Sequence, residues 1–214
     1  MDSERYLAVK EASQTEIVIK KSRFICHAKP VSTEEEAMQF IESIRKNHWS
    51  ATHNCFAYCI GQNDQLQKQS DDGEPSGTAG KPILEVIKNK RIKNVAIVVT
   101  RYFGGIMLGA GGLIRAYASG ASAALESAGI IEKALHQQVT VTMDYTLLGK
   151  VENEVRNRNM MTEETLFTDK VTLICLPFYS EADNVIKWMT ELTQGKAEIE
   201  KGKSYYIDHE HPSQ

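Results

Sequence analysis

Apolar and polar positions along the first 130 residues follow the order expected of alternating strands and helices. β-Branched and aromatic residues alternate or cluster in short runs, which is typical of strands. The sequence Ser32-Thr33-Glu34-Glu35 predicts a helix start, because a hydroxyl residue followed by an acidic one satisfies the free N–H groups there. We predict strands at 15–19, 23–29, 53–61, 66–70 and 94–102, and helices that begin at Ser32, near Ile83 and near Gly111.

The strand at 94–102 contains Val95-Ala96-Ile97-Val98-Val99, an apolar run without alternation. Such a run is typical of a strand that is covered on both faces. A glycine-rich stretch, 104–112, follows it, and apolar residues then recur at helical spacing as far as Gly129, which suits a helix end. These residues predict a buried central strand followed by a long helix.

The pattern starts again near residue 131. The order of the second part is strand, helix, strand, strand, helix, strand, which is the ferredoxin-like βαββαβ arrangement. We therefore predict an α+β chain of two domains, residues 1–133 and 134–214. The predicted strands of the second domain are 139–144, 161–168, 170–176 and 196–207, and its helices are 146–159 and 182–192.

Composition places the chain among ordinary globular proteins, with 42% hydrophobic and 25% charged residues in 214. The net charge of −3 divides into +2 for residues 1–130 and −5 for the rest, so the first part is the better partner for a polyanion. No apolar run reaches the ~20 residues that span a bilayer. The cysteines at 26, 55, 59 and 175 lie in or beside apolar runs, which indicates buried reduced thiols and a cytoplasmic protein without a zinc site.

Two glycine-rich stretches, 71–82 and 104–112, are the most unusual features of the sequence. Glycine allows close approach of backbone to a ligand, and the start of the following helix offers free N–H groups to an anion. Lys81, Arg101 and Arg115 are cations that would complete a phosphate site. The alternative is that the glycines only permit a sharp turn and tight helix packing. Neither stretch matches the P-loop or the dinucleotide-binding fingerprint.

An acidic group, Asp71, Asp72 and Glu74, allows two interpretations. Paired carboxylates bind hard cations or act as acid and base, but aspartates in loops more often fix turns, and we favour the second interpretation. A basic group at 88–93 is either a solvated helix end or a patch that contacts phosphates.

The stretches 70–82 and 100–117, together with Lys21-Ser22-Arg23-Phe24 and 53–58, resemble the signature sequences of the Impact/YigZ family. The resemblance spans essentially the whole chain. It implies a first domain with the fold of domain two of ribosomal protein S5, and a ferredoxin-like second domain similar to domain five of elongation factor G. It also implies a link to translation, through RNA, the ribosome or a protein partner in translation.

Two classes of function remain open. The first is a regulator that binds RNA or the ribosome through its first domain, since arginine beside aromatic residues suits phosphate contact and base stacking. The second is an enzyme that acts on a phosphorylated small molecule or nucleotide, because GHMP kinases share the implied fold. We favour binding, since no nucleophile is paired with a base, and expect no cofactor, metal or membrane partner. The residues expected to bind RNA or another anion are Lys81, Arg101, Tyr102, Phe103, Gly104, Gly105, Gly111, Gly112 and Arg115.

Overall fold

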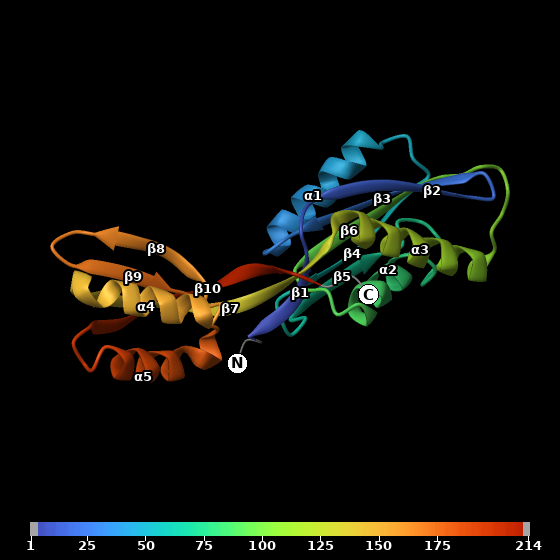
Figure 1. Ribbon diagram of the computed structural model, residues 1–214. Helices are drawn as coiled ribbons and strands as arrows, with labels where there is room; N and C mark the ends of the chain where they lie inside the picture. The colour runs from blue at the N-terminus through green and yellow to red at the C-terminus, as the bar shows by residue number, and fades with distance from the viewer. Residues whose placement is uncertain (1–3, 212–214) are drawn as a thin grey trace. The chain divides into compact units, whose positions relative to one another are not determined.

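The computed structural model describes residues 4–211, which form two compact units (Figure 1). Of the described residues, the first unit comprises 4–132 and 209–211, and the second runs from Lys133 to Asp208. The helices are α1 (Glu34–Asn47), α2 (Gly80–Asn89), α3 (Ala110–Ala128), α4 (Tyr145–Asn157) and α5 (Ala182–Leu192). The strands are β1 (Arg5–Val9), β2 (Ser13–Ile19), β3 (Ser22–Pro30), β4 (His53–Ile60), β5 (Leu66–Ser70), β6 (Val95–Tyr102), β7 (Ile130–Met143), β8 (Thr162–Phe167), β9 (Val171–Cys175) and β10 (Glu198–Glu210).

The sheet of the first unit has the strand order β2-β3-β6-β4-β5, and every neighbouring pair in it is antiparallel. Because β3 and β4 both pair with β6, they run parallel to each other, and α1 connects them. β6 is the central strand. The mixed architecture confirms the predicted α+β class.

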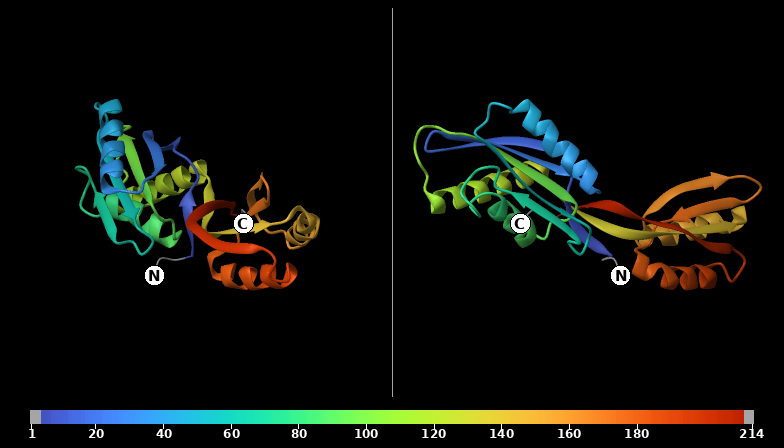
Figure 2. Two further views of the ribbon diagram at one scale, coloured as in Figure 1. Left: turned by 90° about the vertical axis from the view of Figure 1, so that its left-hand side faces the viewer. Right: turned by 180° about the vertical axis from the view of Figure 1, so that it is seen from behind.

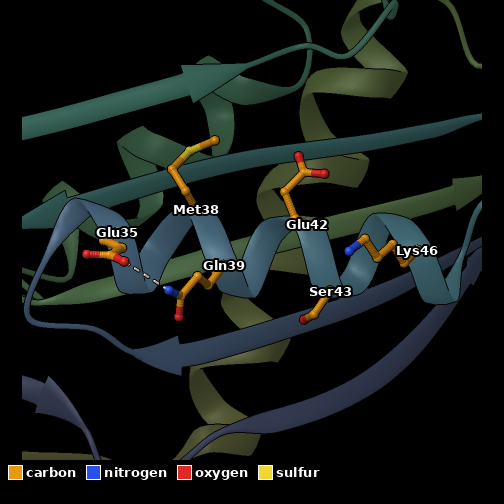
Figure 3. Close-up of a pocket in the computed structure, with 6 residues that line it drawn as sticks. All are labelled: Glu35, Met38, Gln39, Glu42, Ser43 and Lys46. Atoms are coloured by element: carbon orange, nitrogen blue, oxygen red, sulfur yellow. Dashed lines mark hydrogen bonds between the residues drawn. The ribbon is translucent and has the colours of Figure 1, made fainter.

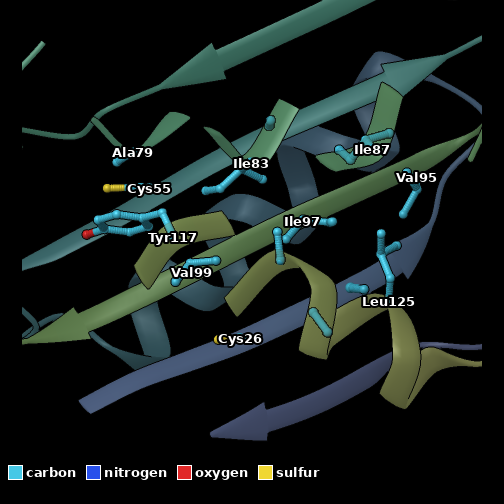
Figure 4. Close-up of a cluster of buried hydrophobic side chains, with 14 of the residues drawn as sticks. Cys26, Cys55, Ala79, Ile83, Ile87, Val95, Ile97, Val99, Tyr117 and Leu125 are labelled. Carbon is cyan, nitrogen blue, oxygen red and sulfur yellow. The ribbon is translucent and has the colours of Figure 1, made fainter. Parts of the chain in front are cut away.

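Both faces of this sheet are covered by helices, as the apolar run in β6 predicted. Val95, Ile97 and Val99 belong to the core under α2 and α3 (Figure 4), whereas Ala96 and Val98 belong to the core under α1. Alternate residues of a strand point to opposite faces, so one apolar strand serves two cores. All four cysteines are buried and free, which confirms the prediction of reduced core thiols.

The cap of helix α1 is Thr33, one residue later than predicted, and the helix begins at Glu34. The Oγ1 atom of Thr33 accepts a hydrogen bond from the backbone N–H of Glu36 at 3.2 Å, and the Glu36 carboxylate accepts one from the N–H of Ser32 at 2.6 Å. The reciprocal pair is therefore Thr33 and Glu36 rather than Ser32 and Glu35. A third glutamate in the run made the two registers indistinguishable by sequence.

The second unit has the strand order β10-β7-β9-β8 (Figure 2). Apolar residues of α4 and α5 share one core with Val139, Val141 and Met143 of β7, so both helices cover the same face. This is the ferredoxin-like arrangement that the sequence predicted. β7 begins at Ile130, well before the predicted start at 139, because the buried polar residues His136 and Gln137 hide its alternation.

β1 lies outside the strands that the sequence predicted. It pairs with β7, whose first residues belong to the first unit. Within residues 4–211, no helix is long and apolar enough to cross a bilayer.

Candidate functional site

Four connections of the first unit meet at one end of its sheet. The backbone N–H of Phe103 donates to the Thr52 hydroxyl at 3.1 Å, and that of Gly104 donates to the Ser22 hydroxyl at 3.3 Å. These bonds join the β6–α3 connection to the start of β3 and to the segment before β4. The four connections are the β2–β3 turn and the segments 48–52, 71–79 and 103–109.

Asp71 organises the connection between β5 and α2. Its carboxylate accepts hydrogen bonds from the backbone N–H groups of Gly77, Ala79 and Gly80 at 2.8, 3.0 and 2.8 Å. Partial burial raises the pKa of Asp71, but the three N–H donors lower it by more, so its pKa lies below the usual range. The charge is used to fold the loop back onto the start of α2.

Asp72 holds the same loop to the start of β4. Its Oδ2 accepts from the backbone N–H of Asn54 at 2.6 Å, and its Oδ1 accepts from Arg45 at 3.3 Å. The Asp72 carbonyl lies 2.8 Å from Nδ1 of His53. Because a carbonyl only accepts, the His53 proton in this bond is on Nδ1.

Glu74 forms a buried ion pair with Arg101. One carboxylate oxygen accepts from Nη1 of Arg101 and from the Tyr117 hydroxyl, both at 2.7 Å. The second oxygen lies 3.8 Å from Nε2 of His53. Burial, the adjacent Cys55 and the bond to Glu74 raise the pKa of Tyr117, so its hydroxyl keeps its proton.

Arg101, which the sequence suggested as a phosphate contact, is only 5% exposed. Its Nη2 donates to the Ser22 hydroxyl at 3.3 Å, and its guanidinium lies 5.6 Å and 5.4 Å from the ring centres of Phe24 and Phe103. Only Nε lacks a hydrogen-bond partner among the described residues. In this conformation Arg101 positions Phe103 and the acidic loop, and its charge faces Glu74 rather than solvent.

The three carboxylates of the acidic group are therefore occupied by protein donors. Among residues 4–211, no group of three or more His, Cys, Asp or Glu side chains is placed to hold a metal ion. Asp71 and Asp72 hold the loop in shape through these hydrogen bonds.

Two histidines of the first unit, His27 and His48, lie among other side chains of the protein. Burial, together with the nearby His48, lowers the pKa of His27 to about 4. Nδ1 of His48 lies 2.9 Å from the Tyr102 hydroxyl, and the Tyr102 ring lies 5.7 Å from the Arg23 guanidinium. Tyr102 is thus half-buried between neighbours.

Gly104 is required by close packing of backbone against backbone. A Cβ at this position would lie 2.0 Å from the backbone of Lys21. Gly105 follows with a φ of +81°, a conformation that favours glycine. Gly111 and Gly112 lie in the first turn of α3, and the space over Gly111 is open except for the far end of Arg115.

The cations of the first unit divide into paired and unpaired groups. Lys81 lies 3.9 Å from Glu85, and two members of the basic group at 88–93 pair with Glu126 and Asp64. The cations that are exposed and form no ion pair within the described part of the chain are Lys10, Lys20, Lys21, Lys46, Lys88, Arg91 and Arg115. Of these seven, only Arg115 was among the expected site residues.

Lys20 and Arg115 lie on the wall of one cavity of about 240 Å³, together with Leu108 and Gly112. The cavity is beside the first turn of α3, where backbone N–H groups are free. Lys20 was missed because it lies in the two-residue turn between β2 and β3, although the Lys20-Lys21 pair between two predicted strands was a usable signal.

Large apolar side chains are exposed at the same end of the sheet. Met107 is 83% exposed and Phe103 49%, and both belong to the β6–α3 connection. Trp49 is 84% exposed in the segment that the Thr52 hydrogen bond joins to Phe103. The exposed Trp49, three residues after the exposed Lys46, was not among the expected site residues.

A separate hollow lies on the outer surface of α1 (Figure 3). All six residues that line it belong to this one helix, and Glu35 accepts a hydrogen bond from Gln39 at 3.2 Å. It has the character of a solvated helix face, without convergent polar groups from other elements.

Comparison with known proteins covers both units. Residues 20–125 match the Impact N-terminal domain, and residues 141–196 match a domain of unknown function, DUF1949. The chain is 52% identical to IMPACT family member YvyE of Bacillus subtilis (strain 168) over 203 residues, covering 95% of this chain and 94% of that protein.

Two further similarities agree with this result. The chain is 39% identical over 148 residues to IMPACT family member YigZ of Escherichia coli (strain K12), covering 65% of this chain and 72% of that protein. A crystal structure of a hypothetical protein superposes with a TM-score of 0.60 at 30% identity, covering 92% of this chain and 97% of the other. The chain belongs to the IMPACT family.

Proposed function

We propose that the first unit binds single-stranded RNA at the loop end of its sheet, as part of a regulatory role in translation. One observation carries the proposal: Lys20 and Lys21 of the β2–β3 turn and Arg115 of α3 are exposed without ion-pair partners among the described residues, and a hydrogen bond joins the start of β3 to the connection that exposes Phe103. The translation link comes from the family resemblance in the signature sequences. We call this end of the sheet, formed by the four connections, the loop end.

The two kinds of side chain have different tasks in this proposal. Lysine and arginine neutralise phosphates, which gives affinity that falls with salt. Phe103 and Trp49 offer flat apolar surfaces on which bases stack, at about 1–3 kcal/mol per base. Unpaired cations beside exposed aromatic residues are the combination that single-stranded nucleic acid requires.

The remaining expected residues support this surface. Arg101 and Tyr102 position the loop from within, Gly104 and Gly105 allow its path, and Gly111 and Gly112 leave the start of α3 accessible to a phosphate. Lys81 lies on α2 with Glu85 as its partner and contributes a peripheral charge. The enzyme alternative receives less support, because each carboxylate of the acidic loop is already engaged by protein donors.

The test is the salt dependence of RNA binding by the full chain. Fluorescence anisotropy with a labelled 12-nucleotide single-stranded RNA should give a log–log slope against salt of roughly −0.7 per phosphate contact. The double variant Lys20→Ala/Lys21→Ala should reduce the magnitude of that slope by roughly 1.4, whereas Phe103→Ala should weaken binding by about 1–3 kcal/mol with the slope unchanged.

The matched control is the double variant Lys187→Ala/Lys196→Ala. Both lysines are exposed, form no ion pair among the described residues and lie in the second unit. The control should bind RNA like the unmodified chain. Absence of binding at low salt, or equal loss in the control, would contradict the proposal.

A further inference from the structure

The sheet of the second unit has a free edge at β8, which pairs with β9 alone among the described strands (Figure 1). Five of its six residues are exposed, and the sixth, Thr165, is half-buried. A free edge presents unpaired N–H and C=O groups, and proteins usually protect it with lysine, proline or a covering element. The β8 sequence, Thr-Glu-Glu-Thr-Leu-Phe, contains neither lysine nor proline.

The opposite edge of this sheet is different. β10 carries Lys201 and Lys203 on either side of Gly202. Lysines on an edge strand protect it against pairing with another chain. β8 has one irregularity, a register shift between Thr162 and Thr165, after which residues as far as Phe167 pair regularly with β9. The regular half of β8 is therefore available for pairing on its outer side.

Apolar side chains gather along β8. Phe167 is 62% exposed, and its ring stacks on that of Tyr145 at a centroid distance of 6.5 Å. The Tyr145 hydroxyl donates to the Thr168 carbonyl at 2.6 Å, which fixes the pair. Leu166 and Met161 are also exposed. Phe167, Tyr145, Leu166 and Met161 are most of the large exposed apolar residues in the described part of the second unit.

The helix-covered side of β8 is hollow. A cavity of about 260 Å³ lies there, with Thr162 and Thr165 of β8 on its wall together with Glu152 and Arg156 of α4. Thr165 and Phe167 pair with Leu173 and Val171 of the core, so they point to this same face. A strand added to the edge would place every second side chain beside this hollow and beside Phe167.

We propose that β8 is a docking edge for an extended segment of another protein in which apolar and basic side chains alternate. The charge of the edge selects the occupant: Glu163 and Glu164 are exposed and form no ion pair with any described residue, although Glu163 accepts a hydrogen bond from Gln138 at 3.0 Å. Apolar side chains of the segment pack on Tyr145 and Phe167, and its basic ones face the two glutamates. Backbone hydrogen bonds supply the rest of the affinity.

A second copy of the chain fits this edge less well. Antiparallel pairing of β8 with itself would place four glutamates on two adjacent strands, where neighbouring like charges destabilise the pair. Self-association is therefore an outcome that the experiment must distinguish from binding of a basic segment.

The test uses the full chain, labelled with ¹⁵N, and an acetylated ten-residue peptide in which lysine and valine alternate. The peptide should shift amide resonances of β8 and α4. A peptide of alternating glutamate and valine should not bind, and methylating alternate backbone nitrogens of the lysine peptide should abolish binding. Equal binding of the methylated peptide would overturn the proposal, because strand addition needs those N–H groups.

Two double variants complete the test. Glu163→Lys/Glu164→Lys should weaken peptide binding about tenfold, since it replaces attraction with repulsion at two exposed positions. Glu198→Lys/Glu200→Lys, an equal change on β10, should alter it less than about twofold. No resonance shift at millimolar peptide, or sedimentation that shows β8-dependent dimers instead, would also overturn the proposal.

Discussion

The β5–α2 and β6–α3 connections of the first unit are both rich in glycine, yet they are held in opposite ways. The Asp71 carboxylate folds the first connection onto the start of α2, and the carboxylates of Asp72 and Glu74 bind it to β4 and β6. The second connection, 103–109, contains no acidic residue and is fixed by backbone bonds at Phe103 and Gly104. The side chains of Ile106 and Met107 in this connection are exposed.

This difference separates residues that hold the loops in place from residues that are free to contact a ligand. Carboxylates that accept several N–H groups cost free energy to desolvate, and they remain buried only because their partners are in place. Apolar side chains that stay exposed contribute nothing to the free energy of folding. Where they gather beside unpaired cations, they mark a surface that a ligand can cover. The first connection builds the loop end, and we propose that the second contacts the ligand.

The largest expected loss of unfolding free energy is at Glu74. Glu74→Ala leaves Arg101 buried without its carboxylate, and breaking a buried ion pair from one side costs about 3–5 kcal/mol. Urea denaturation monitored by circular dichroism measures the loss of unfolding free energy. Glu85→Ala, which removes the exposed partner of Lys81, is the matched control and should cost less than about 1 kcal/mol. Equal losses in the two variants would show that Arg101 is solvated after all.

An intermediate and pH-dependent effect is expected at Asp71. The pKa of this carboxyl is lowered in the folded state, so its contribution is complete above its unfolded pKa of about 4 and is lost as pH falls through the folded value. Asp71→Asn should therefore cost about 1–3 kcal/mol at pH 7, and the difference from the unmodified chain should shrink below about pH 4.

Urea denaturation at a series of pH values measures this difference. Variants in 103–109 provide the comparison, because that connection carries no titratable side chain and their effects should not change with pH. A pH-independent cost for Asp71→Asn would mean that the loop depends on shape rather than on charge.

Much of this fold was accessible from the sequence. Val95-Ala96-Ile97-Val98-Val99 identified the central strand, because an apolar run without alternation is typical of a strand with a core on each face. The pattern after residue 131 predicted the βαββαβ order, since that order depends on local periodicity alone. β1 was missed because its partner, β7, is far away in the chain, and the start of β7 was missed because the buried residues His136 and Gln137 are polar.

Less of the candidate site could be predicted from the sequence. Lys81, Arg101 and Arg115 have the same charge in the sequence, but the structure pairs Lys81 with Glu85, buries Arg101 against Glu74 and leaves Arg115 exposed. Which cation is free depends on long-range contacts such as Arg101 with Ser22, which no local pattern contains. The signature stretches located the loop end as a region that the fold brings together, without assigning its residues to inner or outer positions.

The smallest effect on stability is expected at Met107, and it tests the division between the two connections most directly. Met107→Ser removes a side chain that is 83% exposed, so the unfolding free energy should change by less than about 0.5 kcal/mol. If the β6–α3 connection contacts RNA, the same variant should still weaken binding, because the lost apolar surface is covered only in the complex. Anisotropy and urea denaturation on the same preparation separate the two quantities. Val18→Ser, which removes an exposed apolar side chain from β2, is the control and should leave both unchanged. A Met107 variant that loses stability but retains RNA affinity would reverse the assignment and make this connection, like the first, a part of the scaffold.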